Sequence, residues 1–309
     1  FEFSPQVNVF IGRNGAGKSH VMKLLYSVLR AHREAPSSAT AEDLSLLMKR
    51  KLSGVFRPDD GAVGRLVSRG VGRKKATVTL TAAASPKSAS IECDFTLSTL
   101  GKVTFRSNVL PALEPSVFLP SREALAMYEG FVQAYEEREL SFDETYRDLC
   151  VQLSGRQLRG PRLAAVRALA KELEVVLGGA IRLDGGRFYR VAGGSSLEAH
   201  LLSEGLRKIG VLTHLVLNGS LIKNGFLFWD EPEANLNPRL VTVIARTLRR
   251  LAHHGIQVFV ATHDFLLLHE LALADEYSAA LKDKTPGVDV RFIGLNLSSD
   301  LSEVSVDSA

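Results

Sequence analysis

Apolar residues occur along the chain in short unbroken runs, and two of these runs end in chemically active side chains. Residues 226–231 and 257–263 are the clearest cases, because the first ends in two carboxylates and the second in a histidine. A continuous apolar run of this length is typical of a strand that is buried on both faces of a parallel sheet. Residues 7–11 and 116–119 have the same character. The pattern therefore predicts an α/β protein with a parallel sheet.

Other segments alternate apolar and polar residues, which is typical of half-buried antiparallel strands. Glycine, serine or proline turns separate the first three, at 76–81, 90–97 and 102–105, so an antiparallel sheet is expected there. A hairpin is predicted where the Asp-Gly-Gly turn at 184–186 joins residues 180–183 to residues 187–191. One more strand, at 288–293, precedes a polar tail at 298–309.

Helical periodicity, with apolar residues three or four apart, appears in the remaining segments. A helix is expected from 21 to 29, with a break near Pro36, and another over 42–53. The pattern is mostly helical from 123 to 177 and ends at Gly178. A further helix is predicted over 238–251.

Composition places the chain among ordinary globular proteins. It has 309 residues, of which 45% are hydrophobic and 23% charged, and a net charge of +4 with a pI near 9.1. The only two cysteines, Cys93 and Cys150, lack zinc-ligand or disulfide spacing, and no apolar run reaches the eighteen residues of a membrane helix. We expect a cytoplasmic protein without a membrane span. The chain begins with Phe1 rather than methionine, and residues 1–3 alternate like a strand. We therefore expect the gene to start earlier and to encode a preceding strand.

Residues 12–19 read GRNGAGKS and lie between a predicted strand and a predicted helix, which is the context of a P-loop. Glycines let the backbone amides turn toward an anion, and the helix N-terminus adds its positive dipole end. Lys18 would reach the β- and γ-phosphates, and the Ser19 hydroxyl would bind Mg²⁺. The alternative is a glycine-rich loop with a stray lysine. The predicted nucleotide contacts are Arg13, Asn14, Gly15, Ala16, Gly17, Lys18, Ser19 and His20.

The two carboxylates at 230 and 231 suit the other needs of an NTPase. Asp230 would hold the magnesium ion through its water shell, and Glu231 would polarise the attacking water. Adjacent acids at the end of a strand are otherwise typical of a helix start.

At this point a family resemblance becomes specific. Residues 226–238, FLFWDEPEANLNP, resemble the Walker B and D-loop of ABC-type ATPases, particularly the RecF-like, SMC-like and OLD-like branch. Residues 202–208, LSEGLRK, are similar to the ABC signature, although Glu204 replaces its middle glycine. Residues 262–264, Thr-His-Asp, resemble the switch-histidine loop. The four motifs follow the family's order along nearly the whole chain.

The resemblance implies a head-to-tail homodimer that sandwiches ATP. Ser203 and Gly205 would then contact the γ-phosphate held by the opposite subunit, and His263 would sense its loss. The catalytic residues would be Glu231, His263 and Lys18, with Ser19 and Asp230 holding Mg²⁺. The alternatives are a plain helix N-cap for Ser203 and a structural role for His263.

The resemblance is weaker at the Q-loop, where family members often carry glutamine. Residues 119–123, LPSRE, stand there and resemble runs in bacterial AAA-family proteins of the OLD-like kind. Arg122 or Glu123 would couple the nucleotide to the helical lobe, or else belong to a surface turn. The expected division is an ATPase part at 1–120, a helical lobe at 121–200, and the signature, Walker B, D-loop and switch at 201–309.

The sequence thus predicts an ATPase whose ATP-bound dimer gates a nuclease or toxin partner in anti-phage defence. One alternative is a RecF-like or SMC-like DNA repair or recombination ATPase, since basic residues recur over 57–75 and around Arg156. A solvated loop is the simpler explanation of the basic residues over 57–75. Others are the nucleotide-binding subunit of an ABC transporter and a scaffold that binds ATP without hydrolysis. No nuclease signature is visible in the sequence.

Overall fold

The computed structural model describes residues 1–68, 72, 74–83, 90–105, 113–137, 140–273, 287–297 and 304–308. The chain divides into two compact units, which are described separately. The first comprises Phe1–Met22 and Ser116–Ala309, and the second comprises Lys23–Pro115. Arg69 and Arg73 of the basic segment, Glu139, and residues 298–303 of the predicted tail lie outside the described residues. The predicted domain boundaries at 120 and 200 stay a prediction.

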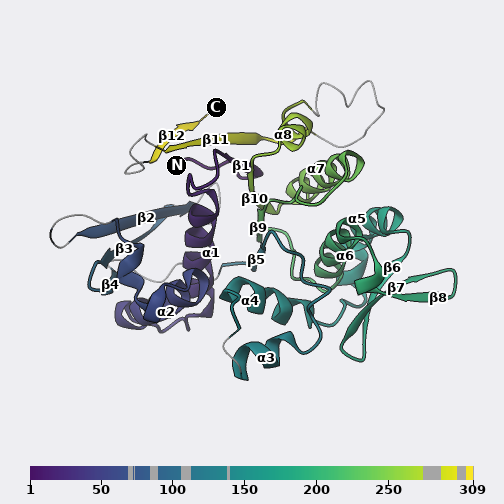
Figure 1. Ribbon diagram of the computed structural model, residues 1–309, viewed down its shortest axis with the longest axis horizontal. Helices are drawn as coiled ribbons and strands as arrows, with labels where there is room; N and C mark the ends of the chain where they lie inside the picture. Colours follow the sequence, from purple (N-terminus) through teal and green to yellow (C-terminus); the bar gives the residue numbers. More distant parts are fainter. Residues whose placement is uncertain are drawn as a thin grey trace. The chain divides into compact units, whose positions relative to one another are not determined.

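The first unit is built on a six-stranded sheet with the order β12-β11-β1-β10-β9-β5 (Figure 1). The five strands from β11 to β5 are parallel, and only β12 runs antiparallel to its neighbour. The predicted α/β fold with a parallel sheet is confirmed. The strands are β1 (Val7–Ile11), β5 (Ser116–Leu119), β9 (Phe226–Asp230), β10 (Gln257–Thr262), β11 (Val290–Leu297) and β12 (Val304–Ser308).

Strand β12 forms where the sequence analysis predicts only a polar tail. The strand pairs with β11 at the edge of the sheet, and residues 305–307 are exposed. An edge strand that is exposed to solvent can be built from polar residues. The polar sequence of β12 therefore gives little indication that it forms a strand.

Capping residues explain where three helices of the first unit begin. Asp143, Asn237 and Asp264 each cap a helix, through a side-chain oxygen that accepts a backbone N–H of its first turn. Helices α5 and α6 lie side by side, as do α7 and α8 (Figure 1). The helices are α3 (Phe131–Glu137), α4 (Glu144–Leu153), α5 (Pro161–Leu177), α6 (Glu204–Leu217), α7 (Pro238–His253) and α8 (Phe265–Ala272), with a 3₁₀ turn at Ala199–Leu201.

A small antiparallel sheet follows α5 in the first unit. The predicted hairpin is present, with β6 (Ala180–Asp184) and β7 (Arg187–Ala192) joined by a turn in which Gly185 and Gly186 both have positive φ. The third strand, β8 (Ser195–Glu198), is absent from the sequence prediction. A second turn with two positive-φ residues, Gly193 and Gly194, precedes it and is the signal that would have located it.

The two faces of the parallel sheet have different side chains. On one face, valine and leucine side chains from β1, β5, β9 and β10 join the main core with the surrounding helices. On the other face, Phe118, Phe228 and Phe259 stand in register on neighbouring strands. The Phe228 ring stacks on Phe259 at 4.8 Å and on Phe118 at 6.2 Å between centroids. This ladder of rings ties β5, β9 and β10 together.

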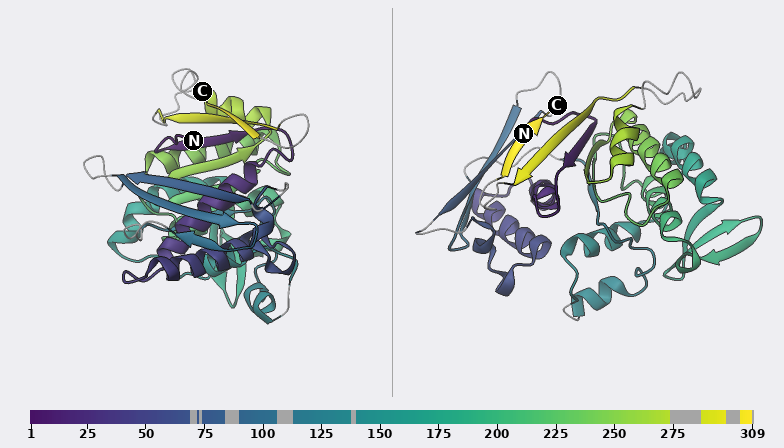
Figure 2. Two further views of the ribbon diagram at one scale, coloured as in Figure 1. Left: turned by 90° about the vertical axis from the view of Figure 1, so that its left-hand side faces the viewer. Right: turned by 45° about the horizontal axis from the view of Figure 1, so that its top comes forward.

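The second unit carries its own core between two helices and a three-stranded sheet. Residues from α1, α2, β3 and β4 form this core, and the strands lie together in order β2-β3-β4 (Figure 2). The predicted antiparallel sheet is therefore present. Its elements are α1 (Lys18–Glu34), which begins in the first unit, α2 (Ala41–Phe56), 3₁₀ turns at Asp59–Gly61 and Val63–Leu66, β2 (Lys75–Ala83), β3 (Ser90–Ser98) and β4 (Val103–Phe105).

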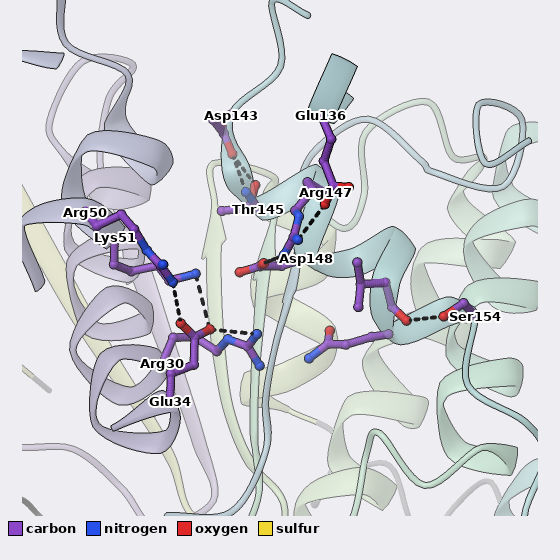
Figure 3. Close-up of polar contacts among 12 residues, drawn as sticks. Arg30, Glu34, Arg50, Lys51, Glu136, Asp143, Thr145, Arg147, Asp148 and Ser154 are labelled. Carbon is purple, nitrogen blue, oxygen red and sulfur yellow. Dashed lines mark hydrogen bonds and ion pairs between the residues drawn. The ribbon is translucent and has the colours of Figure 1, made fainter. Parts of the chain in front are cut away.

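Charged clusters stabilise helix contacts inside each unit (Figure 3). In the second unit, Glu34 of α1 pairs with Arg30 of the same helix and with Arg50 and the buried Lys51 of α2, at 3.0–3.4 Å. Burial makes the Lys51 contact important, because an ammonium group without a partner is costly to desolvate. In the first unit, Arg147 of α4 lies 2.7 Å from Glu136 of α3. Among the described residues, no helix is long and apolar enough to cross a membrane.

Replacing Phe228 with alanine tests the aromatic ladder. The ring is fully buried and stacks on neighbours in two strands, so we expect the free energy of unfolding to fall by roughly 3–5 kcal/mol. Phe265→Ala is the matched control, because that ring is 79% exposed and its loss should change stability by less than about 0.5 kcal/mol. Urea denaturation measures both. Equal losses in the two variants would contradict the role of the ladder.

Candidate functional site

Three of the predicted motifs, namely the P-loop, the two carboxylates and the histidine, lie at one edge of the parallel sheet. Because β1, β9 and β10 run in the same direction, their carboxyl ends lie at the same edge. Gly12 follows β1, Glu231 follows β9, and His263 follows β10. The topology thus brings together three segments that lie far apart in the sequence.

The loop after β1 has the backbone of a phosphate cradle. Gly15 and Gly17 have φ values of 84° and 92°, a region that side chains disfavour. A third glycine, Gly12, is required by packing, since a Cβ there would lie 2.5 Å from the carbonyl oxygen of Leu295 in β11. Arg13, Asn14 and Gly15 are exposed, whereas Ala16 is buried in the loop, and His20 is exposed on the first turn of α1.

Lys18 and Ser19 begin α1 and point to different partners. The Lys18 ammonium group is buried and donates to the carbonyl oxygens of Gly12 at 2.8 Å and Arg13 at 3.2 Å, so it lies against the loop itself. The Ser19 hydroxyl donates to Oδ1 of Asp230 at 2.9 Å. A hydroxyl and a carboxylate from two different chain segments therefore meet beside the cradle.

This pair fits a magnesium ion. Mg²⁺ prefers oxygen ligands and in nucleotide sites takes only one or two from protein, with phosphate and water supplying the rest. Ser19 and Asp230 supply a hydroxyl and a carboxylate oxygen at one point. Among the described residues, no group of three or more His, Cys, Asp or Glu side chains could hold a metal on its own. The donor set is thus that of a nucleotide-dependent ion, which would neutralise phosphate charge when bound.

Glu231 and His263 lie next to each other beyond this pair. The Glu231 Oε1 atom is 3.4 Å from Nδ1 of His263, and both side chains are partly exposed. Glu231 has a φ of 48°, a strained value for a side chain with a Cβ, and its backbone N–H donates to Ala261 at 2.9 Å. Strain of this kind often marks a functional position.

The signature segment contains the N-terminus of α6. Ser203 occupies the N-cap position and is exposed, but its hydroxyl makes no capping hydrogen bond. Gly205 is buried, and a Cβ there would lie 2.6 Å from Leu240 and 2.8 Å from Leu236. Glycine at this position therefore lets α6 approach the start of α7 closely. In the described part of the chain, the Ser203 hydroxyl makes no hydrogen bond with any other predicted site residue.

Lys208, which sequence reasoning missed, joins α6 to the D-loop. It is 3% exposed, and its ammonium group donates to the carbonyl oxygens of Ala234 at 2.7 Å and Pro232 at 3.3 Å. Burial lowers the pKa of Lys208, and nearby Glu204 opposes that shift. Glu204 in turn accepts from Asn235 of the D-loop at 3.1 Å. The acid that replaces the usual signature glycine therefore binds the D-loop.

Glu123 belongs to the turn after β5 and is buried rather than exposed at the surface. Its carboxylate accepts from Arg207 of α6 at 2.6 Å and from the backbone of Leu125 at 2.8 Å. Arg207 also donates to the carbonyl oxygen of Leu202 at 2.5 Å. The signature segment is thus anchored to the turn where family members carry the Q-loop. Arg122, the other predicted candidate, makes no such link in the described contacts.

Glu233 is a second missed residue and sits behind the catalytic candidates. Its side chain is 8% exposed and accepts from the Thr262 hydroxyl at 2.6 Å. Thr262 also accepts the backbone N–H of Asp264 at 3.0 Å. The D-loop therefore contacts Thr262 directly, and Thr262 in turn binds Asp264 on the other side of His263. The only signal in the sequence was that Thr262 and Glu233 lie inside the switch-histidine and D-loop segments, where other residues drew attention first.

The environment of Glu233 predicts a pH effect on stability. Burial raises the pKa of Glu233, so the folded chain holds this proton more tightly than the unfolded chain does. The stabilising contribution is full below the ordinary glutamate pKa and is lost as pH rises through the folded value. Glu233→Gln should therefore gain stability relative to the wild type as pH rises from about 4 to 7.

Urea denaturation at a series of pH values measures this difference. Glu137→Gln is the matched control, because Glu137 is exposed on α3 and its replacement should leave the pH profile of stability parallel to the wild type. A parallel profile for Glu233→Gln as well would contradict the buried environment of Glu233.

Part of the chain matches a known family model, and its fold is similar to solved structures. Residues 136–269 match a family model described as "AAA domain, putative AbiEii toxin, Type IV TA system". An SMC head bound to the C-terminal winged-helix domain of ScpA is similar, with a TM-score of 0.53 and 14% identity over 100% of this chain and 92% of that chain. The Smc head of Pyrococcus furiosus, bound to the C-terminal domain of ScpA, gives 0.50 and 12% over the same shares.

A comparison with curated proteins gives no match. At 12–14% identity, the similarity to solved structures shows the fold alone. The chain therefore has the fold of SMC head domains, and its residues 136–269 match the AAA-domain family model.

Proposed function

We propose that the chain hydrolyses ATP at the carboxyl edge of its parallel sheet. The observation that supports this most directly is the Ser19–Asp230 hydrogen bond, with the Glu231 carboxylate following in the sequence. Ser19 and Asp230 would hold Mg²⁺, and Lys18 would neutralise the transferred phosphate. Glu231 would orient the attacking water, while His263 beside it would respond to the γ-phosphate.

The proposed active form is a homodimer with ATP at two composite sites. Ser203 supports this, because its exposed hydroxyl is not used to cap its own helix and is therefore available to a partner's phosphate. Gly205 would let the helix N-terminus approach that phosphate. Head-to-tail contacts of this kind use two different surfaces of each subunit, and a two-fold axis closes them into a dimer.

The proposed client is a protein effector, a nuclease or toxin that acts in anti-phage defence. The matching family description names a toxin of a Type IV toxin–antitoxin system. The similar SMC heads are bound to a domain of ScpA, which illustrates a protein partner on this fold. ATP binding would close the dimer and hydrolysis would open it, so the partner would sense the nucleotide state.

Glu231→Gln tests both hydrolysis and dimerisation. It keeps the shape of the side chain but removes the base, so we expect the rate of ATP hydrolysis to fall about 10²- to 10⁴-fold while ATP still binds. Light scattering with ATP and Mg²⁺ should then find a stable dimer.

Ser203→Arg in the Glu231→Gln background is the matched control for dimerisation. It should leave ATP binding unchanged and prevent dimer formation, because the larger cation would occupy the place of the partner's phosphate. If Glu231→Gln binds ATP and yet stays monomeric, the sandwich dimer is wrong. If its hydrolysis rate equals the wild type, the role of Glu231 is wrong.

DNA is the second candidate client, and exposed arginines at 156, 159, 162 and 167 favour it. The steady-state rate of ATP hydrolysis with and without duplex DNA tests this role. Stimulation that fades steeply between about 50 and 200 mM salt would indicate phosphate contacts, because counterion release makes DNA affinity salt-dependent. A rate that does not respond to DNA would leave the ATPase in place and favour the protein effector.

A further inference from the structure

A concave pocket of about 550 Å³ lies in the first unit, between the loop that joins α4 to α5, the β6 strand and the C-terminal part of α6. None of its lining residues belongs to the nucleotide site described above. Four arginines line it, namely Arg156, Arg159, Arg167 and Arg182, and Glu174 is the one carboxylate in its lining. The pocket therefore carries a strong positive charge.

Most of this charge has no counter-ion within the described part of the chain. Arg167 pairs with Glu174, about two turns along the same face of α5, at 3.2 Å. Arg156, Arg159 and Arg182 make no ion pair or side-chain hydrogen bond with any described residue. Like charges that share one concavity repel each other, and an anion placed among them relieves that repulsion.

Hydrogen bonds to the backbone hold the loop of this pocket in place. Gln157 donates to the carbonyl oxygen of Ile181 in β6 at 3.3 Å, and the Leu158 backbone donates to Leu217 of α6 at 2.8 Å. Asn218 donates to the carbonyl oxygen of Gln152 at 2.9 Å and holds the end of α4. The loop that bears Arg156 and Arg159 is thus anchored on both sides, which lowers the entropy cost of binding.

The lining also has an apolar part, which includes Leu158, Ile181 and Leu183. His214 lies beneath it, 1% exposed, with Nε2 at 2.9 Å from the carbonyl oxygen of Leu153. Burial lowers the pKa of His214, so at neutral pH the imidazole adds no charge. Arginines beside leucines suit a ligand that combines phosphate groups with a less polar body.

We propose that this pocket binds a phosphate-bearing ligand of nucleotide size, separate from the ATP of the P-loop. Arginine guanidinium groups would hold the phosphate oxygens through paired, charge-assisted hydrogen bonds. A free nucleotide and the terminal phosphate of a nucleic acid strand offer the same chemistry.

Calorimetric titration at low salt tests the proposal in the full chain carrying Lys18→Ala, which weakens phosphate binding at the P-loop. The probes are inorganic pyrophosphate, thymidine 5′-monophosphate, and a five-residue oligothymidylate with and without a 5′-phosphate. We expect Arg159→Ala and Arg182→Ala each to weaken probe binding about tenfold, the effect of losing one charged hydrogen-bonding group.

Arg162→Ala is the matched control, because Arg162 is exposed at the start of α5, close to the pocket, but does not line it. Its affinity for every probe should equal that of the Lys18→Ala parent. Tighter binding of the phosphorylated oligomer than of the unphosphorylated one would identify a strand end. Equal binding of the mononucleotide would identify a free nucleotide.

Three results would overturn the proposal: no binding of any probe, equal weakening by Arg162→Ala, or tighter binding of a hexaglutamate peptide than of any phosphate probe. The second would mean diffuse surface charge, and the third a carboxylate site. Melting curves of each variant establish that it is folded. The proposed ATPase role is tested separately by Glu231→Gln in a chain that keeps Lys18, so failure of the pocket proposal is distinguishable from failure of the ATPase proposal.

Discussion

The parallel pairing of β1, β10 and β9 is the constraint on which the rest of the site depends. Parallel strands in register bring their carboxyl ends to one edge, so the P-loop, Asp230 and Glu231, and His263 lie near one another although they are far apart in the sequence. Burial on both faces holds that register, with aliphatic packing on one side and the phenylalanine ladder on the other. A slip of one residue would exchange the two faces.

A buried polar network connects this edge to the signature helix. Lys208 donates to two D-loop carbonyl groups, and Glu233 in the same loop accepts from Thr262 of β10. Such groups are costly to bury, and they are stable only while all partners stay in place. A movement of α6 would therefore reach the residues on either side of His263.

The Glu123–Arg207 ion pair gives the signature segment a second anchor. Its carboxylate also caps the turn after β5, so the same side chain holds both the edge of the sheet and the start of α6. The proposed phosphate pocket lies at the other end of α6, near Leu217. Helix α6 thus connects the Glu123–Arg207 ion pair at its start with the arginine pocket at its end, and its apolar face supplies much of the main core.

Local sequence was sufficient for much of this structure. The short apolar runs indicated buried strands, because they are typical of a parallel sheet that is covered on both faces, and the glycines and lysine of residues 12–19 indicated the P-loop. What the tertiary structure decided are contacts between segments distant in the chain. The Ser19–Asp230 bond spans 211 residues, and nothing local indicates that Lys208 is buried or that Glu123 meets Arg207. The edge strand β12 and the arginine pocket were equally invisible, because exposed strands and clustered charges depend on which surfaces the fold places side by side.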